Sequence, residues 1–556
     1  MNFINFLLKY IEPERRLFEF CTNNPLRTQK KVLLRYIRRN KNTEFGSKFN
    51  FSKIRSIEDY RAMVPISNYE EIRPYIDKIA RGDQGVLTKD KVVFFGATSG
   101  TTNLPKLIPT TNYSERIKDH LMSLWSYYIV RDHPDVLDGK ILAIVSPEIE
   151  GKTEAGIPFG AESGYSYKAL PKPVANLYAL PYEVFDIEDY EARHYAILRI
   201  SLEQNITDIA TLNPNMIILL LHKIEKWQDM IIDDISSGGL SERFAIAPEI
   251  RATLTKRLRQ NPKRANELKN ILKTRGKLLP KYFWPNMKII ECWQGGMMKL
   301  YLKELDDYFG PIPKRDIGCV STEARASIPI KNNRSDGVLA ILTNFYEFIP
   351  KEDALCANRR ALICTELEVG KEYFIVVTTA GGLYRYNIDD IIKVTGFFNK
   401  TPTIEFVQKG LGATSLAGEK LYASHVNDAL AKVLESENFR LEFFCAVTKP
   451  AEGPRYAFLV EFSEPAPSDE IALKFLASIE EELGRQDREY VFVRKAQLLA
   501  PPSLKILKSG SFEAYRARKI ASGRQEGQFK FAELTSDANF ETNFEIERII
   551  YLPGKK

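Results

Sequence analysis

The sequence holds few of the residues that build metal sites and disulfide frameworks. Among its 556 residues there are only six cysteines and five histidines. The cysteines are scattered without a Cys-x-x-Cys pair, and the histidines lack the spacing of metal ligands. This pattern argues against both a zinc site and a disulfide framework, and it fits a reducing compartment. We therefore expect a cytoplasmic protein.

Long apolar runs are absent as well. The longest one, Met216–Leu221, stops at His222 and is far shorter than a membrane-spanning helix. The apolar residues 1–11 lack a basic leading segment and a small-residue cleavage site, so we expect a packed amphipathic helix there rather than a signal peptide. The sequence thus predicts no membrane partner.

The excess of one charge sign is also small. The chain has 79 Lys and Arg against 72 Asp and Glu, which gives a formal net charge of +7. Because these cations are spread along the whole chain, they give little support for nucleic-acid binding. We expect small-molecule substrates and no nucleic acid as partners. The oligomeric state stays open, and a monomer is compatible with the sequence.

At this length one compact core is not expected, so the chain should form two or more domains. Residues 1 to about 90 have mainly helical patterns, and strands then alternate with helices, which predicts an α/β fold. The expected helices are 113–131, 189–204, 214–237 and much of 241–275. The expected strands are 140–145, 287–293, 315–320, 338–342 and 373–379.

The composition becomes small and flexible at Gly410–Thr414, which we interpret as a hinge. Beyond it we expect strands at 439–447, 456–462 and 489–494, a helix at 467–483, and a basic, mobile tail at 508–530. This part has the size of a small α+β domain. We therefore predict a large first domain, residues 1–410, and a small mobile lid domain, residues 411–556.

A stretch dense in hydroxyls, Val92–Pro109, carries the strongest functional signal. An apolar strand leads into a loop that we name the hydroxyl loop, residues 98–105, and Lys106 follows it. The loop donors are Thr98, Ser99, Gly100, Thr101 and Thr102. Such closely spaced donors suit a polyphosphate, although the Walker A pattern is absent. An ordinary polar turn between two strands is the alternative interpretation.

Three residues directly after an expected strand, Ser321, Thr322 and Glu323, form a second candidate. Glu323 could hold Mg²⁺ against phosphate oxygens, because this cation often takes only one or two carboxylates. A helix N-cap with an acidic first turn explains the same residues, and on these residues alone it is the favoured interpretation.

A third candidate follows the glycine-rich turn Thr378–Gly382. The adjacent carboxylates of Asp389 and Asp390 suit the paired hydroxyls of a ribose. Arg385 could bind a phosphate, or it could form a structural salt bridge with one of these aspartates. The last candidates are Lys420, just past the hinge, and Lys530 in the tail, which a closing lid could bring to a phosphate.

Together these residues resemble the adenylate-forming superfamily, because Thr98–Lys106 is similar to its phosphate-binding loop apart from Asn103. More narrowly, the chain resembles the auxin-responsive Gretchen Hagen family of acyl acid amido synthetases, in its bacterial branch. The segments that carry this resemblance are Phe95–Pro109, Ile317–Pro329, Leu342–Pro350, Thr378–Phe397, Ile404–Lys420 and Gly510–Leu534.

The resemblance implies a ligase that uses ATP and Mg²⁺ to adenylate a small carboxylic acid and then transfers the acyl group to the amine of an amino acid. It implies that Thr98–Thr102 hold the phosphates, that Ser321, Thr322 and Glu323 lie at the adenylate and the metal, that Asp390 binds the ribose, and that Lys420 and Lys530 are catalytic. The alternatives are an acyl- or aryl-CoA ligase with the same first step and a nucleotide-binding protein without turnover.

At two positions the sequence departs from the family patterns, and there the residue roles are not carried over to this chain. The superfamily hinge Gly-Arg-x-Asp is replaced by Gly410–Ala413, and Asn387–Asp389 departs from the plant pattern, which leaves the role of Asp389 open. The sequence does not select the acyl acid or the amino acid. Four aromatic residues are candidates for an acyl pocket: Trp125, Tyr165, Tyr167 and Tyr346.

We predict that Lys530→Ala slows adenylate formation but leaves ATP affinity nearly unchanged, because the lysine would act on charge that grows in the transition state. ATP–pyrophosphate exchange measures the first quantity and equilibrium ATP binding the second. An unaltered exchange rate would remove Lys530 from the site.

Overall fold

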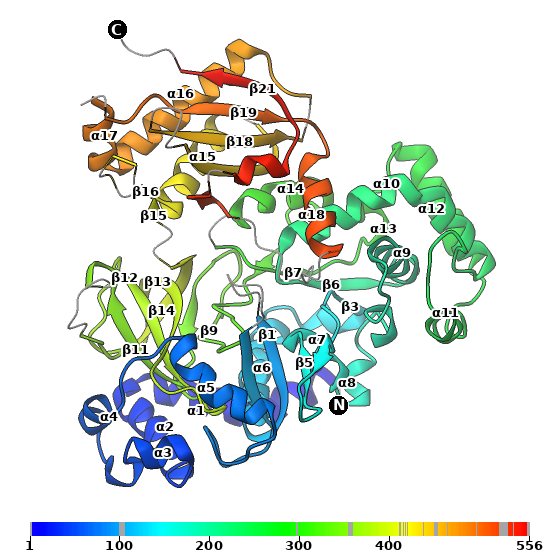
Figure 1. Ribbon diagram of the computed structural model, residues 1–556. Coiled ribbons are helices and arrows are strands. Elements are labelled where there is room, and N and C mark those ends of the chain that lie inside the picture. The colour runs from blue at the N-terminus through cyan, green and yellow to red at the C-terminus, as the bar shows by residue number, and fades with distance from the viewer. Residues whose placement is uncertain are drawn as a thin grey trace. The chain divides into compact units, whose positions relative to one another are not determined.

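The computed structural model describes residues 3–552 except 99–105, 296–297, 354–359, 411–412, 415, 418, 420, 438, 450–453, 464, 496–497, 522–531 and 538. It divides into two compact units, Met1–Phe406 and Val407–Lys556 (Figure 1). The fold is of the mixed α/β type, with a large first unit and a smaller α+β second unit.

The chain begins with helices, as the sequence predicts. They are α1 (Phe3–Thr22), α2 (Pro25–Arg39), α3 (Glu44–Lys48), α4 (Ile57–Met63) and α5 (Tyr69–Ala80). Ser56 and Asn68 start α4 and α5 with capping boxes. Each side chain accepts a hydrogen bond from the backbone amide of the third helical residue, and the carboxylate of that residue accepts one from the amide of Ser56 or Asn68. No described helix is both long and apolar enough to cross a membrane.

The hydroxyl loop connects the edge strand β2 to its neighbour β1 in a four-stranded sheet with the order β2-β1-β5-β4. These strands are β1 (Val92–Thr98), β2 (Lys106–Thr111), β4 (Gly151–Lys152) and β5 (Pro158–Gly160). The antiparallel register pairs Thr98 with Lys106, so the loop starts and ends at one edge of this hairpin. Helix α6 (Asn112–Asp132) follows directly, and Thr111 and Ser114 cap its start.

A parallel sheet forms the second layer of the first unit. Its strands are β3 (Lys140–Ala143), β6 (Ile206–Ala210), β7 (Ile289–Glu291) and β8 (Lys314–Arg315), in that order. They share a hydrophobic cluster with the helices α9 (Tyr190–Ser201), α10 (Pro214–Ser237), α12 (Pro262–Arg275) and α14 (Lys299–Phe309). Strand β6 was not expected, and β8 is shorter than the expected strand 315–320.

A six-stranded sheet completes the first unit, in the order β11-β12-β13-β14-β10-β9. The strands are β9 (Ser327–Ile328), β10 (Gly337–Leu339), β11 (Phe345–Pro350), β12 (Glu372–Thr378), β13 (Tyr386–Phe398) and β14 (Thr401–Lys409). Strand β12 confirms the expected strand 373–379. The neighbours β11, β13 and β14 were not expected; in β13 the adjacent residues Asp389 and Asp390 interrupt the alternation of apolar and polar side chains. The sheet shares a hydrophobic cluster with α1, α2 and α4 to α6.

The second unit contains a five-stranded sheet with the order β20-β17-β18-β19-β21. Its strands are β17 (Leu441–Lys449), β18 (Arg455–Phe462), β19 (Ser503–Leu507), β20 (Leu534–Thr535) and β21 (Ile546–Tyr551), preceded by the small pair β15 (Ala413–Thr414) and β16 (Leu421–Tyr422). The helices are α15 (Ala423–Glu437), α16 (Asp469–Gln486), α17 (Arg488–Lys495) and α18 (Ser511–Ala521).

Two expectations for this unit were wrong. The expected strand 489–494 is the helix α17, and part of the expected mobile tail is the helix α18. In both stretches apolar residues at three- and four-residue spacing, such as Tyr490 and Val493 or Phe512 and Tyr515, are buried, which is the helical period.

Asp208 on β6 and Glu291 on β7 form a buried carboxyl pair in the parallel sheet. Burial raises the pKa of Asp208 to about 7, although its hydrogen bond with Glu291 lowers it. Burial and the charge of Asp208 raise the pKa of Glu291 well above its ordinary value, which the neighbouring Arg315 partly offsets. The folded pair therefore binds protons that the unfolded chain releases near pH 4.

We predict that unfolding stability falls as the pH rises from about 5 to 8, because the native state binds more protons than the unfolded state in this window. In Asp208→Asn the free energy of unfolding should decrease less across this pH window, by an amount on the order of a few kcal/mol, since one pKa unit corresponds to about 1.4 kcal/mol. Urea unfolding across the window measures this. The exposed residue Asp229 provides the control Asp229→Asn. An undiminished slope in Asp208→Asn would contradict the assignment.

Candidate functional site

Five segments that are far apart in the sequence line one narrow cavity in the first unit, with a volume of about 30 Å³. They are the end of β2, one face of α6, the turn after Val320, the segment Thr343–Asn344 and the loop after β12. Two sequence candidates, Thr322 and Glu323, lie in this lining, and a third, the turn Thr378–Gly382, contributes Thr379 to Gly381. The cavity therefore joins regions that the sequence predicts to act together.

Gly96 on β1 sets the distance between this hairpin and the turn that carries Thr322. A Cβ atom on Gly96 would lie 2.3 Å from Cγ2 of Thr322, so a larger residue there would displace this side chain. Gly381 approaches β2 in the same way, since its Cβ would lie 2.7 Å from the carbonyl oxygen of Pro109. Two glycines thus allow two segments, the turn of Thr322 and the loop of Gly381, to pack closely on the strands that flank the hydroxyl loop.

Ser321 to Ala324 form a tight turn, and the helix N-cap favoured for these residues was wrong. The Ser321 amide donates to the Ala324 carbonyl at 2.9 Å, and the Ala324 amide donates to Oγ of Ser321 at 3.2 Å. Val320 and Arg325 pair as an antiparallel bridge across this turn. Because no helix follows, the turn presents Thr322 and Glu323 at its tip.

The chain reaches this turn through a buried carboxylate, Asp316. Its two oxygens accept bonds from the amides of Gln294, at 2.7 Å, and Gly318, at 2.6 Å. Burial raises the pKa of Asp316 to about 7, and these two amide bonds lower it. Asp316 thereby ties the segment after β8 to the segment after β7, where the carboxyl ends of parallel strands often carry ligand sites.

Glu323 and Asp390 lie near a common neighbour, the buried side chain of Tyr386. Burial raises the pKa of Tyr386, and the charges of Glu323, Asp390 and Asp389 raise it further. The charges of Glu323 and Asp390 thus act on the same tyrosine.

Asp389 and Asp390 project from a bulge in β13. Phe374 pairs with Ile391 and Val376 with Asn387, so the three residues 388–390 lie opposite Ile375 alone. Asp389 has a φ of 63°, and its amide donates to Oδ1 of Asn387 at 3.0 Å. Bulges of this kind redirect side chains next to functional sites. Asp389 is exposed and Asp390 is half-buried.

Arg385 lies inside the first unit as a structural ion pair. Its guanidinium donates to both carboxylate oxygens of Glu347, at 2.8 and 3.0 Å, and to the carbonyl of Val64 at 2.8 Å. The sequence alternative of a salt bridge is therefore correct, but the carboxylate that pairs with Arg385 is Glu347. A role for Arg385 in nucleotide binding stays a prediction.

Two cations of the cavity, Lys118 and Arg325, were not singled out in the sequence. Lys118 donates to Glu162 and lies 3.1 Å from Glu115. Burial lowers its pKa, but these two carboxylates outweigh burial and raise it. Burial lowers the pKa of Arg325, and the same carboxylates offset part of the effect. For Lys118 the sequence contained one indication, because Ser114, Lys118 and Leu121 are spaced to lie on one face of the helix α6.

Several predicted residues fall outside the part of the chain that the structure describes. They are Ser99, Gly100, Thr101, Thr102, Lys420 and Lys530. Thr98 is the last residue of β1, and Lys106, the first of β2, has its ammonium 5.5 Å from the ring centre of Tyr69. The amide of Leu107 donates to the hydroxyl of that tyrosine at 2.8 Å. These contacts fix the start of β2, where the loop ends.

The four aromatic candidates for an acyl pocket do not line this cavity. Trp125 and Tyr346 are buried in the main hydrophobic cluster, and Tyr167 packs against the cluster around the parallel sheet. Tyr165 stacks on Phe94 with ring centres 4.4 Å apart. Packing in the core explains all four.

Comparison with known proteins gives matches along nearly the whole chain. Three family models match in succession: the GH3 family N-terminal domain at residues 14–314, the GH3 family central domain at 337–409 and the GH3 family C-terminal domain at 423–539. The indole-3-acetic acid-amido synthetase GH3.3 of Arabidopsis thaliana is 26% identical over 541 residues, which cover 93% of this chain and 90% of that protein. The jasmonoyl--L-amino acid synthetase JAR4 of Nicotiana attenuata is 27% identical over 542 residues, 92% of each chain.

A solved structure shows the same fold. The GH3.15 acyl acid amido synthetase superposes with a TM-score of 0.85 at 22% identity, and the alignment covers 97% of both chains. At this identity the likeness concerns the fold, including the arrangement of the sheets described above.

We predict that Gly96→Ala destabilises the protein by about 1–3 kcal/mol, because the new methyl group overlaps the Thr322 side chain. Without this contact the same change in a strand would stabilise by about 0.4–1 kcal/mol. Thr322→Ser keeps the hydroxyl and removes the methyl group, so the double variant should regain most of the loss. Urea unfolding of the four chains forms a double-mutant cycle. An equal loss with Thr and Ser at position 322 would contradict the contact.

Proposed function

Because this chain belongs to the GH3 family, we propose that it uses ATP to join a small carboxylic acid to the amine of an amino acid, with release of pyrophosphate and AMP. The observation that carries the proposal is the unbroken order of the three family domains over residues 14–539, with full-length relatives that are amido synthetases. The protein is accordingly a carbon–nitrogen ligase of the adenylate-forming kind.

The chemistry requires activation, since a free carboxylate has no good leaving group. Its oxygen attacks the α-phosphorus of ATP, pyrophosphate leaves, and the carboxylate becomes a mixed anhydride with AMP. The amine then attacks the acyl carbon, the bond to AMP breaks, and the amine proton is lost. In such reactions at phosphorus, the enzyme acts mainly by positioning the reactants and by stabilising the negative charge of the transition state.

The first half-reaction is assigned to the domain 1–410. Thr98 to Thr102 would bind the phosphates, Ser321 and Thr322 the adenylate, and Asp390 the ribose. The support is that Gly96, two residues before Thr98 on β1, lies close to Thr322, and that the charges of Asp390 and Glu323 act on the same tyrosine. The domain 411–556 would be the mobile lid that brings Lys420 and Lys530 to the reacting groups.

Glu323 fits a magnesium ion that is bound mainly by substrate. Among the described residues no three His, Cys, Asp or Glu side chains gather as metal ligands. Mg²⁺ usually keeps several waters and takes one or two carboxylates together with phosphates, so a single half-buried glutamate is a suitable protein ligand. Bound there, the ion would neutralise phosphate charge. Glu323 would then fix its position.

The narrow cavity would receive only the carboxylate end of the acid, because its volume of about 30 Å³ is that of one water molecule. Arg325 supplies a cationic group there, whereas Lys118 is already held by Glu162 and Glu115. Ile117 and Leu121 supply an apolar wall on α6. We further propose that the chain belongs to the bacterial branch of the family, because Asn387–Asp389 departs from the plant pattern. We also propose a cytoplasmic location, because the described cysteines are free.

ATP–pyrophosphate exchange over a panel of carboxylic acids tests the first half-reaction. We expect exchange that depends on one class of acid, followed by amide formation with amino acids and none with coenzyme A. Product with coenzyme A alone would identify an acyl-CoA ligase instead. ATP binding without exchange for any acid would identify a nucleotide-binding protein without turnover.

We predict that Arg325→Ala raises the KM for the acid by about 10-fold or more and leaves the KM for ATP nearly unchanged, because a charged hydrogen bond is worth about 1.5–3 kcal/mol. Arg325→Lys should retain part of the affinity. Steady-state kinetics with each substrate varied separately measure the effect. The exposed residue Lys331 provides the control Lys331→Ala. An unchanged KM for the acid in Arg325→Ala would place the carboxylate elsewhere.

A further inference from the structure

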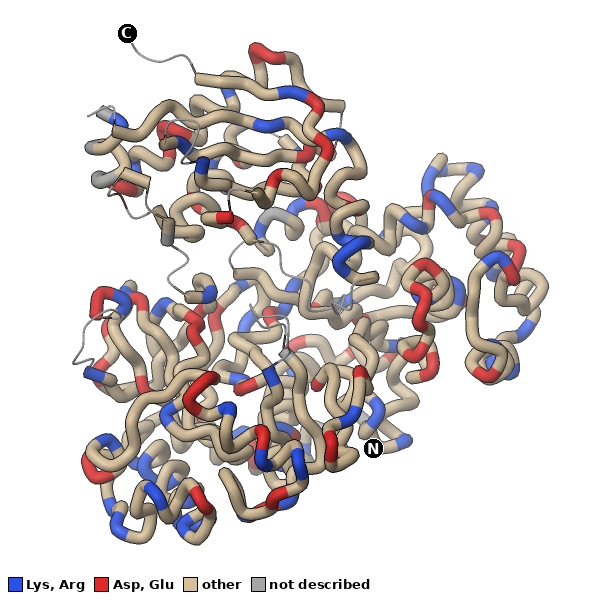
Figure 2. The backbone as a smooth tube through the Cα atoms, in the orientation of Figure 1, with Lys and Arg blue, Asp and Glu red and all other residues tan. Residues whose placement is uncertain are grey.

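Helix α2 segregates its side chains into an apolar face and a strongly basic face. The buried face includes Val32, Leu33, Tyr36 and Ile37. The other face carries six cations in fifteen residues and no acidic residue. They are Arg27, Lys30, Lys31, Arg35, Arg38 and Arg39. Figure 2 shows that over most of the chain cations and carboxylates are instead interspersed.

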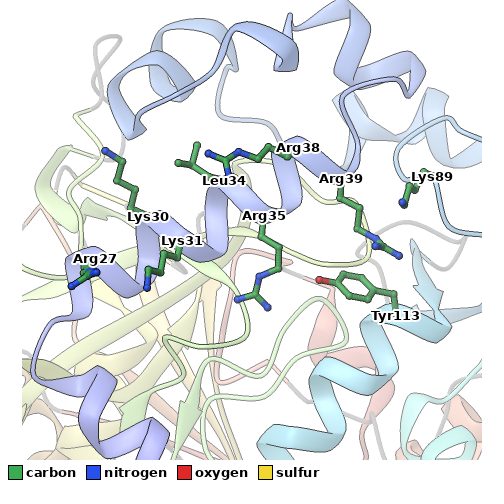
Figure 3. Close-up of a pocket in the computed structure, with 9 residues that line it drawn as sticks. All are labelled: Arg27, Lys30, Lys31, Leu34, Arg35, Arg38, Arg39, Lys89 and Tyr113. Atoms are coloured by element: carbon green, nitrogen blue, oxygen red, sulfur yellow. The ribbon is translucent and has the colours of Figure 1, made fainter.

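These cations line a pocket of about 620 Å³ together with Lys89, Leu34 and Tyr113 (Figure 3). Seven of its nine lining residues are Lys or Arg, and none is Asp or Glu. The whole chain has only seven more cations than carboxylates. In Figure 3 Arg35 and Arg39 reach from α2 toward Tyr113 on α6, and the space beside them is open to solvent.

Little of this charge is neutralised within the described part of the chain. Arg39 pairs with Asp90 at 2.7 Å, and its guanidinium lies 4.0 Å from the ring centre of Tyr113. For the other six cations of the pocket, the described residues provide no ion pair. Several of them are three or four positions apart on α2, such as Lys31 and Arg35, where like charges destabilise a helix. A bound polyanion would remove this repulsion.

The shape and chemistry of the pocket favour a small phosphate-bearing molecule. Its volume lies within the range of small-ligand sites. A row of guanidinium and ammonium groups suits phosphate groups, which offer oxygens on every side. A membrane surface is flat and would also need apolar side chains on the exposed face, whereas the apolar face of α2 is buried. A nucleic acid would need a longer basic track.

The opposite face of α2 contacts the segment that lines the candidate active site. The side-chain amide of Gln29 donates to the carbonyls of Ile341, at 2.8 Å, and Asn344, at 2.7 Å, and the hydroxyl of Tyr36 donates to the carbonyl of Thr343. Asn344 and Thr343 line the narrow cavity. A molecule bound on the basic face therefore has a direct physical route to the active site.

We propose that the basic pocket of α2 is an effector site for a small, soluble polyphosphate. Binding neutralises the cationic row on α2 and changes the rate of adenylation through Gln29 and Tyr36. The binding part does not depend on the proposed function, whereas the change in rate rests on it.

Isothermal titration calorimetry of the full chain with inositol hexakisphosphate tests the binding. We expect one molecule per chain with an affinity that falls steeply with salt. The variant Lys31→Glu/Arg35→Glu should bind about 100-fold more weakly, since each charge-assisted contact is worth about tenfold or more. ATP–pyrophosphate exchange should change at least twofold (about 0.4 kcal/mol) with the probe in the wild type and not in the variant.

Two further variants keep the test decisive. Lys31→Gln/Arg35→Gln removes the charges without reversing them, in case charge reversal prevents folding. Lys256→Glu/Lys273→Glu makes the same charge change at two exposed positions, one directly after α11 (Pro248–Thr255) and one on α12, and should bind normally. No binding, equal binding to the wild type and Lys31/Arg35 variants, or tighter binding to phosphatidylserine vesicles or to an RNA oligomer would overturn the site. Binding with an unchanged exchange rate would overturn its effector role.

Discussion

The site depends on a close contact between a glycine in a strand and the methyl group of Thr322. A glycine at position 96 lets the hairpin of the hydroxyl loop pack closely on the turn that carries Glu323. The charge of Glu323 acts on Tyr386 together with that of Asp390, which lies in the bulge of β13.

Much of the fold could be predicted from local patterns. The helical beginning of the chain, strand β12 and the helix α16 follow directly from the periodicity of apolar residues. The long hairpin of β13 and β14 could not, because it carries polar side chains and a bulge at Asp389 that interrupt the alternation. The helix α17 was taken for a strand because Tyr490 and Val493 suit both structures, and only tertiary packing decides between them.

The candidate site was predictable in its outline and not in its details. Loops rich in hydroxyls, glycine or carboxylates indicated the positions of Thr322, Glu323 and Asp390, which the structure places around common neighbours. The partner of Arg385 could not be predicted, because Glu347 lies on another strand. Lys118, Arg325 and the basic pocket of α2 also depend on which elements meet in three dimensions, and single-sequence patterns do not contain that information.

The central claim is that the hydroxyl loop, the turn at Ser321 and the bulge in β13 serve a single nucleotide. Hydrogen exchange followed by mass spectrometry, with and without ATP and Mg²⁺, tests this claim most directly. We predict that the nucleotide slows exchange together in peptides from Val92–Thr111, Ile317–Ala326 and Thr378–Ile391. Slower exchange in only one of these peptides, or in none, would contradict the claim.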